Sequence, residues 1–150
     1  MHCILPSPCG PLRIEASPQA ITGILFLDED VPVLPPTSPL LAEACRQLNA
    51  YFTGQLTRFT LSLAPAGTAF QQQVWQALLT IPWGEQRSYG EVASAIGNPR
   101  AVRAVGAANG RNPIPILIPC HRVIGANGSL TGYAGGLERK RWLLAHEAKC

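Results

Sequence analysis

The chain has 150 residues, which is enough for one ordinary domain or two small ones, each with a hydrophobic core. Hydrophobic residues make up 47% and charged residues 14%, which excludes a disordered chain, and no apolar run suits a membrane span or a secretory signal. Residues 1–70 carry three basic and five acidic side chains, whereas residues 71–150 carry nine basic and four acidic side chains. The excess of positive charge in the second half favours a polyanionic partner for it.

The first half is expected to form a small unit of mixed α and β structure. Residues 12–17 (LRIEAS) and 21–30 (ITGILFLDED) are typical of two strands joined by a short Ser-Pro-Gln turn. Residues 31–39 (VPVLPPTSP) then read as a proline-rich connector.

Residues 39–54 are predicted to form an amphipathic helix that Gly54 ends. Cys45 belongs to the apolar face of this helix, which favours a packed core thiol over a functional one. Residues 57–65 (TRFTLSLAP) alternate like a third strand, and residues 64–67 are the candidate domain boundary.

The cysteines show no spacing typical of a metal site or a disulfide framework, and their number is odd. They are Cys3, Cys9, Cys45, Cys120 and Cys150. His2, Cys3 and Cys9 lie close together in the sequence, but a fourth ligand is not evident. We therefore expect free thiols of a reducing cytosol and no bound metal.

The second half is predicted to be mostly helical. Residues 69–82 carry apolar side chains on one helical face, and residues 88–112 read as a helix, a break and a second helix. Ser88 and Glu91 have the spacing of a capping box, and Gly97 is a suitable C-terminal stop.

The second of these helices is expected to start with Asn98 as N-cap and Pro99 in the first helical position. Most of its side chains are very small, and Arg103 is a long cation among them. The small residues are Ala101, Ala104, Val105, Gly106, Ala107 and Ala108. The pair fits a DNA-binding helix-turn-helix, but tight packing inside the protein would welcome the same residues.

A rigid apolar segment then ends in a thiol, an imidazole and a guanidinium at Cys120, His121 and Arg122. A histidine can activate a cysteine, and Glu147 is the carboxylate best placed to orient the imidazole. Direct contact between neighbouring side chains requires a turn or a water between them. From these residues alone, a structural and a catalytic role stay open.

Three stretches together resemble the O6-alkylguanine-DNA alkyltransferases, also called methylated-DNA–protein-cysteine methyltransferases. They are residues 112–125 (NPIPILIPCHRVIG), 88–115 (SYGEVASAIGNPRAVRAVGAANGRNPIP) and 132–147 (GYAGGLERKRWLLAHE). The first half matches more loosely, through SPCGPLRIEAS and LNAYFTG. The resemblance implies a ribonuclease H-like α/β domain over residues 1–66 and a winged helix-turn-helix-like alkyl-transfer domain over residues 67–150.

The resemblance also implies roles for the residues around the cysteine. Cys120 corresponds to the alkyl acceptor, and His121, oriented by Glu147, would draw off its proton through a water. Asn112 would tie the preceding turn to the cysteine segment. Tyr89 would hydrogen-bond the base and help it leave.

Other residues match the family's contacts with DNA. Arg103 would enter the duplex where the damaged nucleotide has rotated out, and the small residues near it, Ala104, Gly106 and Ala107, would lie in the minor groove. Backbone atoms near Cys120 and Val123 would read the exocyclic amine of guanine. The loop with Tyr133 and Ala134 would cover the pocket, and Ala134 could offer only its backbone N–H.

The implied activity is direct and irreversible repair, in which one alkyl group moves from O6 of guanine, or O4 of thymine, to the protein. No cofactor is required, because DNA supplies the alkyl group. The implied partner is duplex DNA carrying O6-alkylguanine, bound by a monomer or cooperatively, in the cytoplasm and at the nucleoid in a bacterium.

Two other functions remain as alternatives. A lesion-sensing or helix-turn-helix binding module would not need Cys120 for its activity. A cysteine hydrolase with Cys120, His121 and Glu147 would turn over many times, but the chain has no local signature of a cysteine protease.

Overall fold

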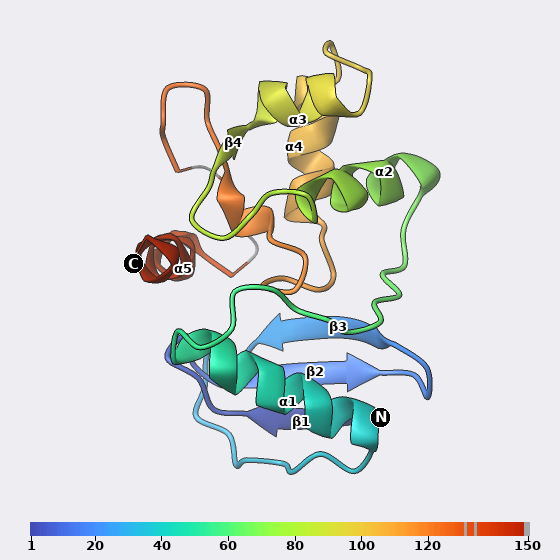
Figure 1. The fold of residues 1–150 in the computed structure, drawn as a ribbon, viewed down its shortest axis with the longest axis vertical. Helices are drawn as coiled ribbons and strands as arrows, with labels where there is room; N and C mark the ends of the chain where they lie inside the picture. Colours follow the sequence, from blue (N-terminus) through green and yellow to red (C-terminus); the bar gives the residue numbers. More distant parts are fainter. Residues whose placement is uncertain (131, 134, 149–150) are drawn as a thin grey trace. The chain divides into compact units, whose positions relative to one another are not determined.

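The computed structural model describes residues 1–130, 132–133 and 135–148, and the chain separates into two compact units, Met1–Ala66 and Gly67–Cys150 (Figure 1). Within the described part, no helix has both the length and the apolar character needed to cross a membrane.

The first unit contains an antiparallel sheet with the strand order β1-β2-β3. Its strands are β1 (His2–Leu5), β2 (Leu12–Ala16) and β3 (Ile21–Phe26). The register places Ile14 of the central strand opposite Cys3 on one side and Ile24 on the other, and all three side chains are buried. Strand β1 was not expected, because its four residues are too few to show a clear alternation.

Helix α1 (Pro39–Phe52) packs on β1 and β2 (Figure 1). Ser38 is its N-cap and accepts a hydrogen bond from the backbone N–H of Leu41, with Pro39 in the first turn. The predicted helix over residues 39–54 is confirmed, apart from its last two residues. Gly54 follows it with φ 80°, a conformation that glycine adopts without steric cost.

The third strand predicted over residues 57–65 is wrong. Only Leu63 pairs there, in a single parallel bridge with Ile21. The side chain of Gln47 instead holds Thr60, because its oxygen accepts from the Thr60 backbone N–H and its nitrogen donates to the Thr60 hydroxyl. Strand β3 also ends at Phe26 rather than at residue 30, before the acidic run that begins at Asp28.

The second unit contains four helices and one short pair of parallel strands in its described residues (Figure 1). The helices are α2 (Ala69–Leu78), α3 (Tyr89–Ala95), α4 (Val102–Gly110) and α5 (Leu137–Glu147). The strands are β4 (Arg87–Ser88) and β5 (Val123–Ile124), and the 3₁₀ turn η1 (Cys120–Arg122) precedes β5. The predicted helix over 69–82 ends at Leu78. The backbone N–H groups of Thr80 and Ile81 bond three residues back, to Ala77 and Leu78, so the chain leaves the helix in a tightened turn before Pro82.

Helices α2, α3 and α4 pack against one another. Trp75 of α2 is almost fully buried, and its indole N–H donates to the backbone oxygen of Ala108 on α4 at 2.9 Å. The capping box predicted for α3 is confirmed, since Ser88 and Glu91 each accept a hydrogen bond from the other's backbone N–H. Gly97 ends this segment with φ 77°.

The predicted start of the second helix is wrong. Helix α4 begins at Val102, its N-cap is Ala101, and no side chain caps it. The backbone oxygen of Asn98 accepts from the N–H of Ala101, so residues 98–101 form a separate turn that contains Pro99. The loop between α3 and α4 is therefore three residues longer than the pattern indicated.

Candidate functional site

A side-chain clamp shapes the apolar segment before Cys120. The amide nitrogen of Asn112 donates to the backbone oxygen of Ile118 at 2.8 Å, and its oxygen accepts from the N–H of Ile114 at 2.9 Å. Between them Ile116 has φ 73°, a region that β-branched residues rarely occupy. The buried clamp holds this strained loop and fixes where the chain enters η1.

Cys120 is the first residue of η1 and is 3% exposed. Burial raises the pKa of its thiol to about 11, although a hydrogen bond with Asn112 and the charge of Lys140 act in the opposite direction. The resting sulfur is therefore a protonated thiol at neutral pH, and nucleophilic chemistry requires a base nearby.

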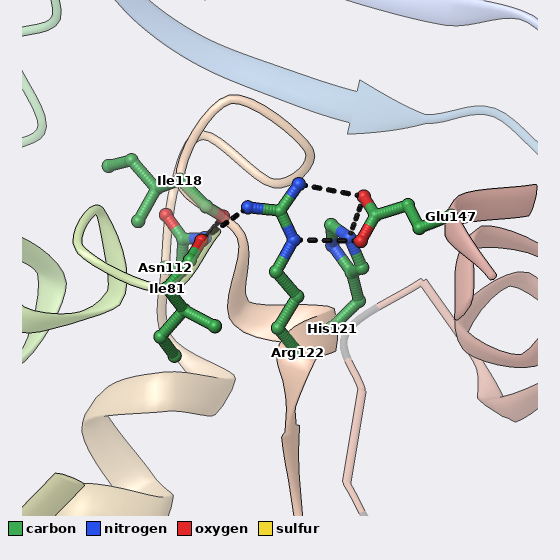
Figure 2. Close-up of polar contacts among 6 residues, drawn as sticks. All are labelled: Ile81, Asn112, Ile118, His121, Arg122 and Glu147. Carbon is green, nitrogen blue, oxygen red and sulfur yellow. Dashed lines mark hydrogen bonds and ion pairs between the residues drawn. The ribbon is translucent and has the colours of Figure 1, made fainter. Parts of the chain in front are cut away.

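A titratable imidazole lies at the next residue along the turn. His121 is fully buried, and its Nε2 lies 2.7 Å from Oε2 of Glu147 on α5. Figure 2 shows the Glu147 carboxylate reaching both the ring of His121 and the guanidinium of Arg122. Nε and a terminal nitrogen of Arg122 donate to this carboxylate at 2.7 and 2.9 Å, and its other terminal nitrogen donates to the backbone oxygen of Ile81.

The charges of this network are set by its contacts. Burial alone would raise the pKa of Glu147, but hydrogen bonds from His121 and Arg122 outweigh burial and hold the pKa at about 2. Burial lowers the pKa of His121 despite the neighbouring carboxylate. At neutral pH the imidazole is thus neutral and the carboxylate ionised.

The tautomer of His121 follows from these contacts. Nε2 carries the hydrogen that is donated to Glu147, which leaves a lone pair on Nδ1. Nδ1 is buried and has no hydrogen-bond partner among the residues that the structure describes. It is therefore the ring atom that can accept a proton.

The sequence did not reveal two buried polar side chains at this site. The ammonium of Lys140 on α5 is fully buried and donates to the backbone oxygen of Val123 at 2.7 Å. Asn109 on α4 is 2% exposed and donates to the backbone oxygen of Cys120 at 3.3 Å, while its own Oδ1 has no partner in the described part of the chain. Lys140 belongs to a charged run that is typical of a solvated helix face, so its burial was not predictable. Asn109 follows the apolar Val105 by one helical turn, and this spacing could have predicted that Asn109 is buried.

Helix α4 presents a face of small side chains to solvent. Its exposed residues are Val102, Arg103, Ala104, Ala107 and Gly110. Gly106 is half-buried and faces Tyr89 at the start of α3, because a Cβ built on Gly106 would lie 3.9 Å from the tyrosine ring. The helix is therefore slim on both sides, with one exposed guanidinium at Arg103.

The remaining predicted site residues lie elsewhere in the second unit. Val123 begins β5 directly after η1, and Tyr133 is buried with 9% exposure. Ala134 lies outside the described residues. Among those that are described, no three histidine, cysteine or acidic side chains gather closely enough to hold a metal ion.

Comparisons with known proteins agree along the whole chain. The family described as the DNA binding domain of 6-O-methylguanine DNA methyltransferase matches residues 69–149, and that described as its ribonuclease-like domain matches residues 2–65. These matches and the structure confirm the expected fold class of an α/β domain followed by a mostly helical domain.

Individual relatives are similar over nearly their full lengths. A methylated-DNA–protein-cysteine methyltransferase of Methanosarcina acetivorans is 50% identical, with 99% of each chain covered. One from Mycobacterium tuberculosis is 53% identical, with 94% of this chain and 88% of the relative covered. The crystal structure of Mycobacterium tuberculosis OGT in complex with DNA matches with a TM-score of 0.89 and 52% identity, covering 97% of this chain and 91% of that one. The chain therefore belongs to the family of 6-O-methylguanine DNA methyltransferases.

Proposed function

We propose that this protein repairs DNA by moving an alkyl group from O6 of guanine to Sγ of Cys120, irreversibly and once per molecule. The observation that carries the proposal is the buried array of Cys120, His121 and Glu147, in a chain that belongs to this family. A solved relative that is 52% identical is a complex with DNA, which supports DNA as the partner.

Activation begins with the proton of the Cys120 thiol. Nδ1 of His121 takes this proton, directly or through a water, and the ring becomes an imidazolium. Glu147 stabilises that cation through Nε2, while the two hydrogen bonds from Arg122 keep the carboxylate ionised and in place. Arg122 is thus a positioning residue that acts through Glu147.

The thiolate then attacks the alkyl carbon in line with its bond to O6. The sulfur–carbon bond forms as the carbon–oxygen bond breaks, and guanine leaves with the electron pair. Tyr89, or a water, shares this developing charge by donating a hydrogen bond. The product is a thioether without a good leaving group, so each molecule reacts once.

The alkyl carbon is stacked inside the duplex, so the nucleotide must rotate into the protein, which costs a few kcal/mol. The slim exposed face of α4 with Ala104 and Ala107 lies in the minor groove, Gly106 leaves room for Tyr89 on the other side of the helix, and Arg103 fills the gap left by the base. Contacts between basic residues and phosphates make this binding dependent on salt. We assign the transfer to residues 67–150 and a supporting role to residues 1–66.

Two backbone oxygens near the acceptor sulfur recognise the base. Alkylation at O6 leaves N1 of guanine without its hydrogen, so the exocyclic amine is the donor that the base can offer to the oxygens of Cys120 and Val123. Each of these oxygens already accepts from a buried side chain, Asn109 and Lys140 respectively. Asn109 and Lys140 therefore position the two acceptors. The oxygen of Cys120 also accepts from the backbone N–H of Val123 in the 3₁₀ turn, so the amine shares this oxygen with two protein donors.

Coverage of the pocket, substrate range and assembly are inferred from the family resemblance. The loop with Tyr133 and Ala134 covers the pocket, and alkylated O4 of thymine is a second substrate. The protein works in the cytoplasm, at the nucleoid in a bacterium, as a monomer or cooperatively along DNA. It needs no cofactor, because the transferred group comes from DNA.

The test is to mix the protein with a duplex that carries one O6-methylguanine. Nuclease digestion then releases the nucleosides, and the guanine formed is counted as the O6-methylguanine that has been converted. We expect guanine to stop increasing at one per protein molecule, and Cys120→Ser to form none while it still binds the duplex. Several guanines per molecule would show a hydrolytic enzyme. Binding without any guanine from the unmodified chain would show a lesion-sensing module.

A further inference from the structure

Two further cysteines lie in contact in the first unit. Sγ of Cys3 and Sγ of Cys45 are 3.5 Å apart, and either can donate its hydrogen to the other. Cys3 belongs to β1 and Cys45 to α1, the helix that packs on this strand (Figure 1). The proposed alkyl transfer uses neither thiol.

Regular structure on both sides keeps the two sulfurs together. Cys3 pairs with Ile14 in the antiparallel ladder, and Cys45 lies in the middle of a helix with a side-chain N-cap. A disulfide bond measures about 2.05 Å, so rotation of the side chains with a small shift of the edge strand has to close the remaining gap. Both partners are free thiols in the structure.

We propose that Cys3 and Cys45 form a reversible disulfide when a hydroperoxide oxidises the protein. The thiolate of Cys45 attacks the peroxide, a sulfur–oxygen bond forms as the oxygen–oxygen bond breaks, and an alcohol or water leaves with one proton. Sγ of Cys3 then attacks the resulting sulfenic acid. The sulfur–sulfur bond forms, hydroxide leaves and takes the proton of Cys3 as water, and the peroxide has accepted two electrons.

Exposure and charge both favour Cys45 as the first sulfur to react. Cys45 keeps 8% of its surface exposed, whereas Cys3 keeps none. The hydrogen bond from Cys3 lowers the pKa of Cys45, and the same contact raises the pKa of Cys3. Burial raises the pKa of Cys120 to about 11, so that thiol is the poorer target for peroxide.

The disulfide joins the edge strand to the helix that covers it. It closes a loop between positions far apart in the sequence, which restricts the unfolded chain and stabilises the first unit. Cys120 belongs to the second unit and stays free to accept an alkyl group. Oxidation would therefore strengthen the first unit without ending repair.

The experiment treats the protein with hydrogen peroxide, blocks free thiols with iodoacetamide and maps tryptic peptides without reduction. We expect the peptide of residues 1–13 to be linked to the peptide of residues 14–46. The mass of the linked pair should equal the sum of the two peptides minus two hydrogens, and dithiothreitol should release both peptides. Cys9 shares the first peptide, so Cys9→Ala is the matched control and must keep the link. Cys3→Ala and Cys45→Ala must each abolish it, with circular dichroism showing which variants fold.

Two further readings complete the test. The cross-linked protein should melt at a higher temperature and should still form one guanine per molecule from methylated duplex. The proposal would be overturned if peroxide added oxygen to Cys120 or Cys9 while Cys3 and Cys45 stayed reduced. In that case both would still react with iodoacetamide after the protein is unfolded. The disulfide is detected by peptide mass and not by repair activity. If untreated protein fails the repair assay, the proposed function fails, but the test of the disulfide still stands.

Discussion

Lys140 places a buried positive charge near the proposed acceptor thiol, where it opposes the effect of burial on the pKa of Cys120. Lys140→Gln keeps a donor for the backbone oxygen of Val123 but removes the charge. We expect the pKa of Cys120 to rise by about one unit or more, since one neighbouring charge commonly shifts a pKa that far. The measurement is the alkylation rate of the Cys120 peptide between pH 7 and pH 12, a range that includes the pKa of about 11, so that slowing caused by the lost charge fades at the highest pH.

Arg141→Gln is the matched control, because it removes an exposed charge from the same helix. It should leave the pH profile of Cys120 unchanged. If Lys140→Gln slows alkylation equally at every pH, the lysine supports the loop mechanically and its charge does not act on the thiol.

Asn109 holds the backbone oxygen of Cys120, one of the two acceptors assigned to the exocyclic amine of the base. Asn109→Leu removes this hydrogen bond with little change in volume. We expect the preference for O6-methylguanine over O6-methylhypoxanthine, which lacks the amine, to fall about 3- to 10-fold, the usual value of one hydrogen bond. Single-turnover rates on duplexes with each base measure the preference. An equal loss on both bases would leave Asn109 with a role in packing only.

Helix α4 is expected to need its small side chains on the exposed face. Ala104→Leu adds bulk where the helix is proposed to enter the minor groove, so we expect duplex affinity to fall at least 10-fold by titration at fixed salt. Ala42→Leu on α1 is the control, because it enlarges another exposed helical alanine. Reaction with free O6-methylguanine should stay unchanged in both variants. Undiminished affinity of Ala104→Leu for duplex would exclude this face from the interface.

Secondary structure was predictable where the pattern was long and capped. The apolar faces identified α1 and α2, and the Ser88–Glu91 spacing identified the start of α3. The third strand of the first unit failed because the side chain of Gln47 replaces a neighbouring strand at Thr60, a contact between distant residues that local alternation does not show.

The candidate site was predictable only in part for a similar reason. The resemblance pointed to Glu147 as partner of His121, and the two lie in hydrogen-bond contact. Lys140 was missed because a charged run on a helix is usually solvated, and only the packing of α5 on η1 buries its ammonium. Asn109 was hidden by the small residues around it.

The buried carboxylate of Glu147 makes the stability of the folded protein depend on pH. Glu147 has a pKa of about 2 in the folded protein against 4.5 ordinarily, so its contribution is complete above pH 4.5 and is lost as the pH falls toward 2. The contribution is on the order of 3 kcal/mol. The pKa of buried His121 is also lowered, so its contribution starts to decline below about pH 6.5.

Urea unfolding between pH 7.5 and pH 3 tests this dependence. Trp75, Trp83 and Trp142 all belong to the second unit, so tryptophan fluorescence follows the unit that contains Glu147. We expect Glu147→Gln to be less stable at neutral pH and to lose less stability on acidification than the unmodified chain. Parallel pH curves for the two proteins would contradict the role given to this carboxylate.

Transfer to Cys120 is tested by the mass of the intact protein after reaction with a duplex that carries one O6-methylguanine, followed by peptide mapping. We expect a gain of one methyl group per molecule, located on Cys120, and no further gain when more duplex is added. A methyl group on another residue, or guanine formed without any gain in protein mass, would contradict it.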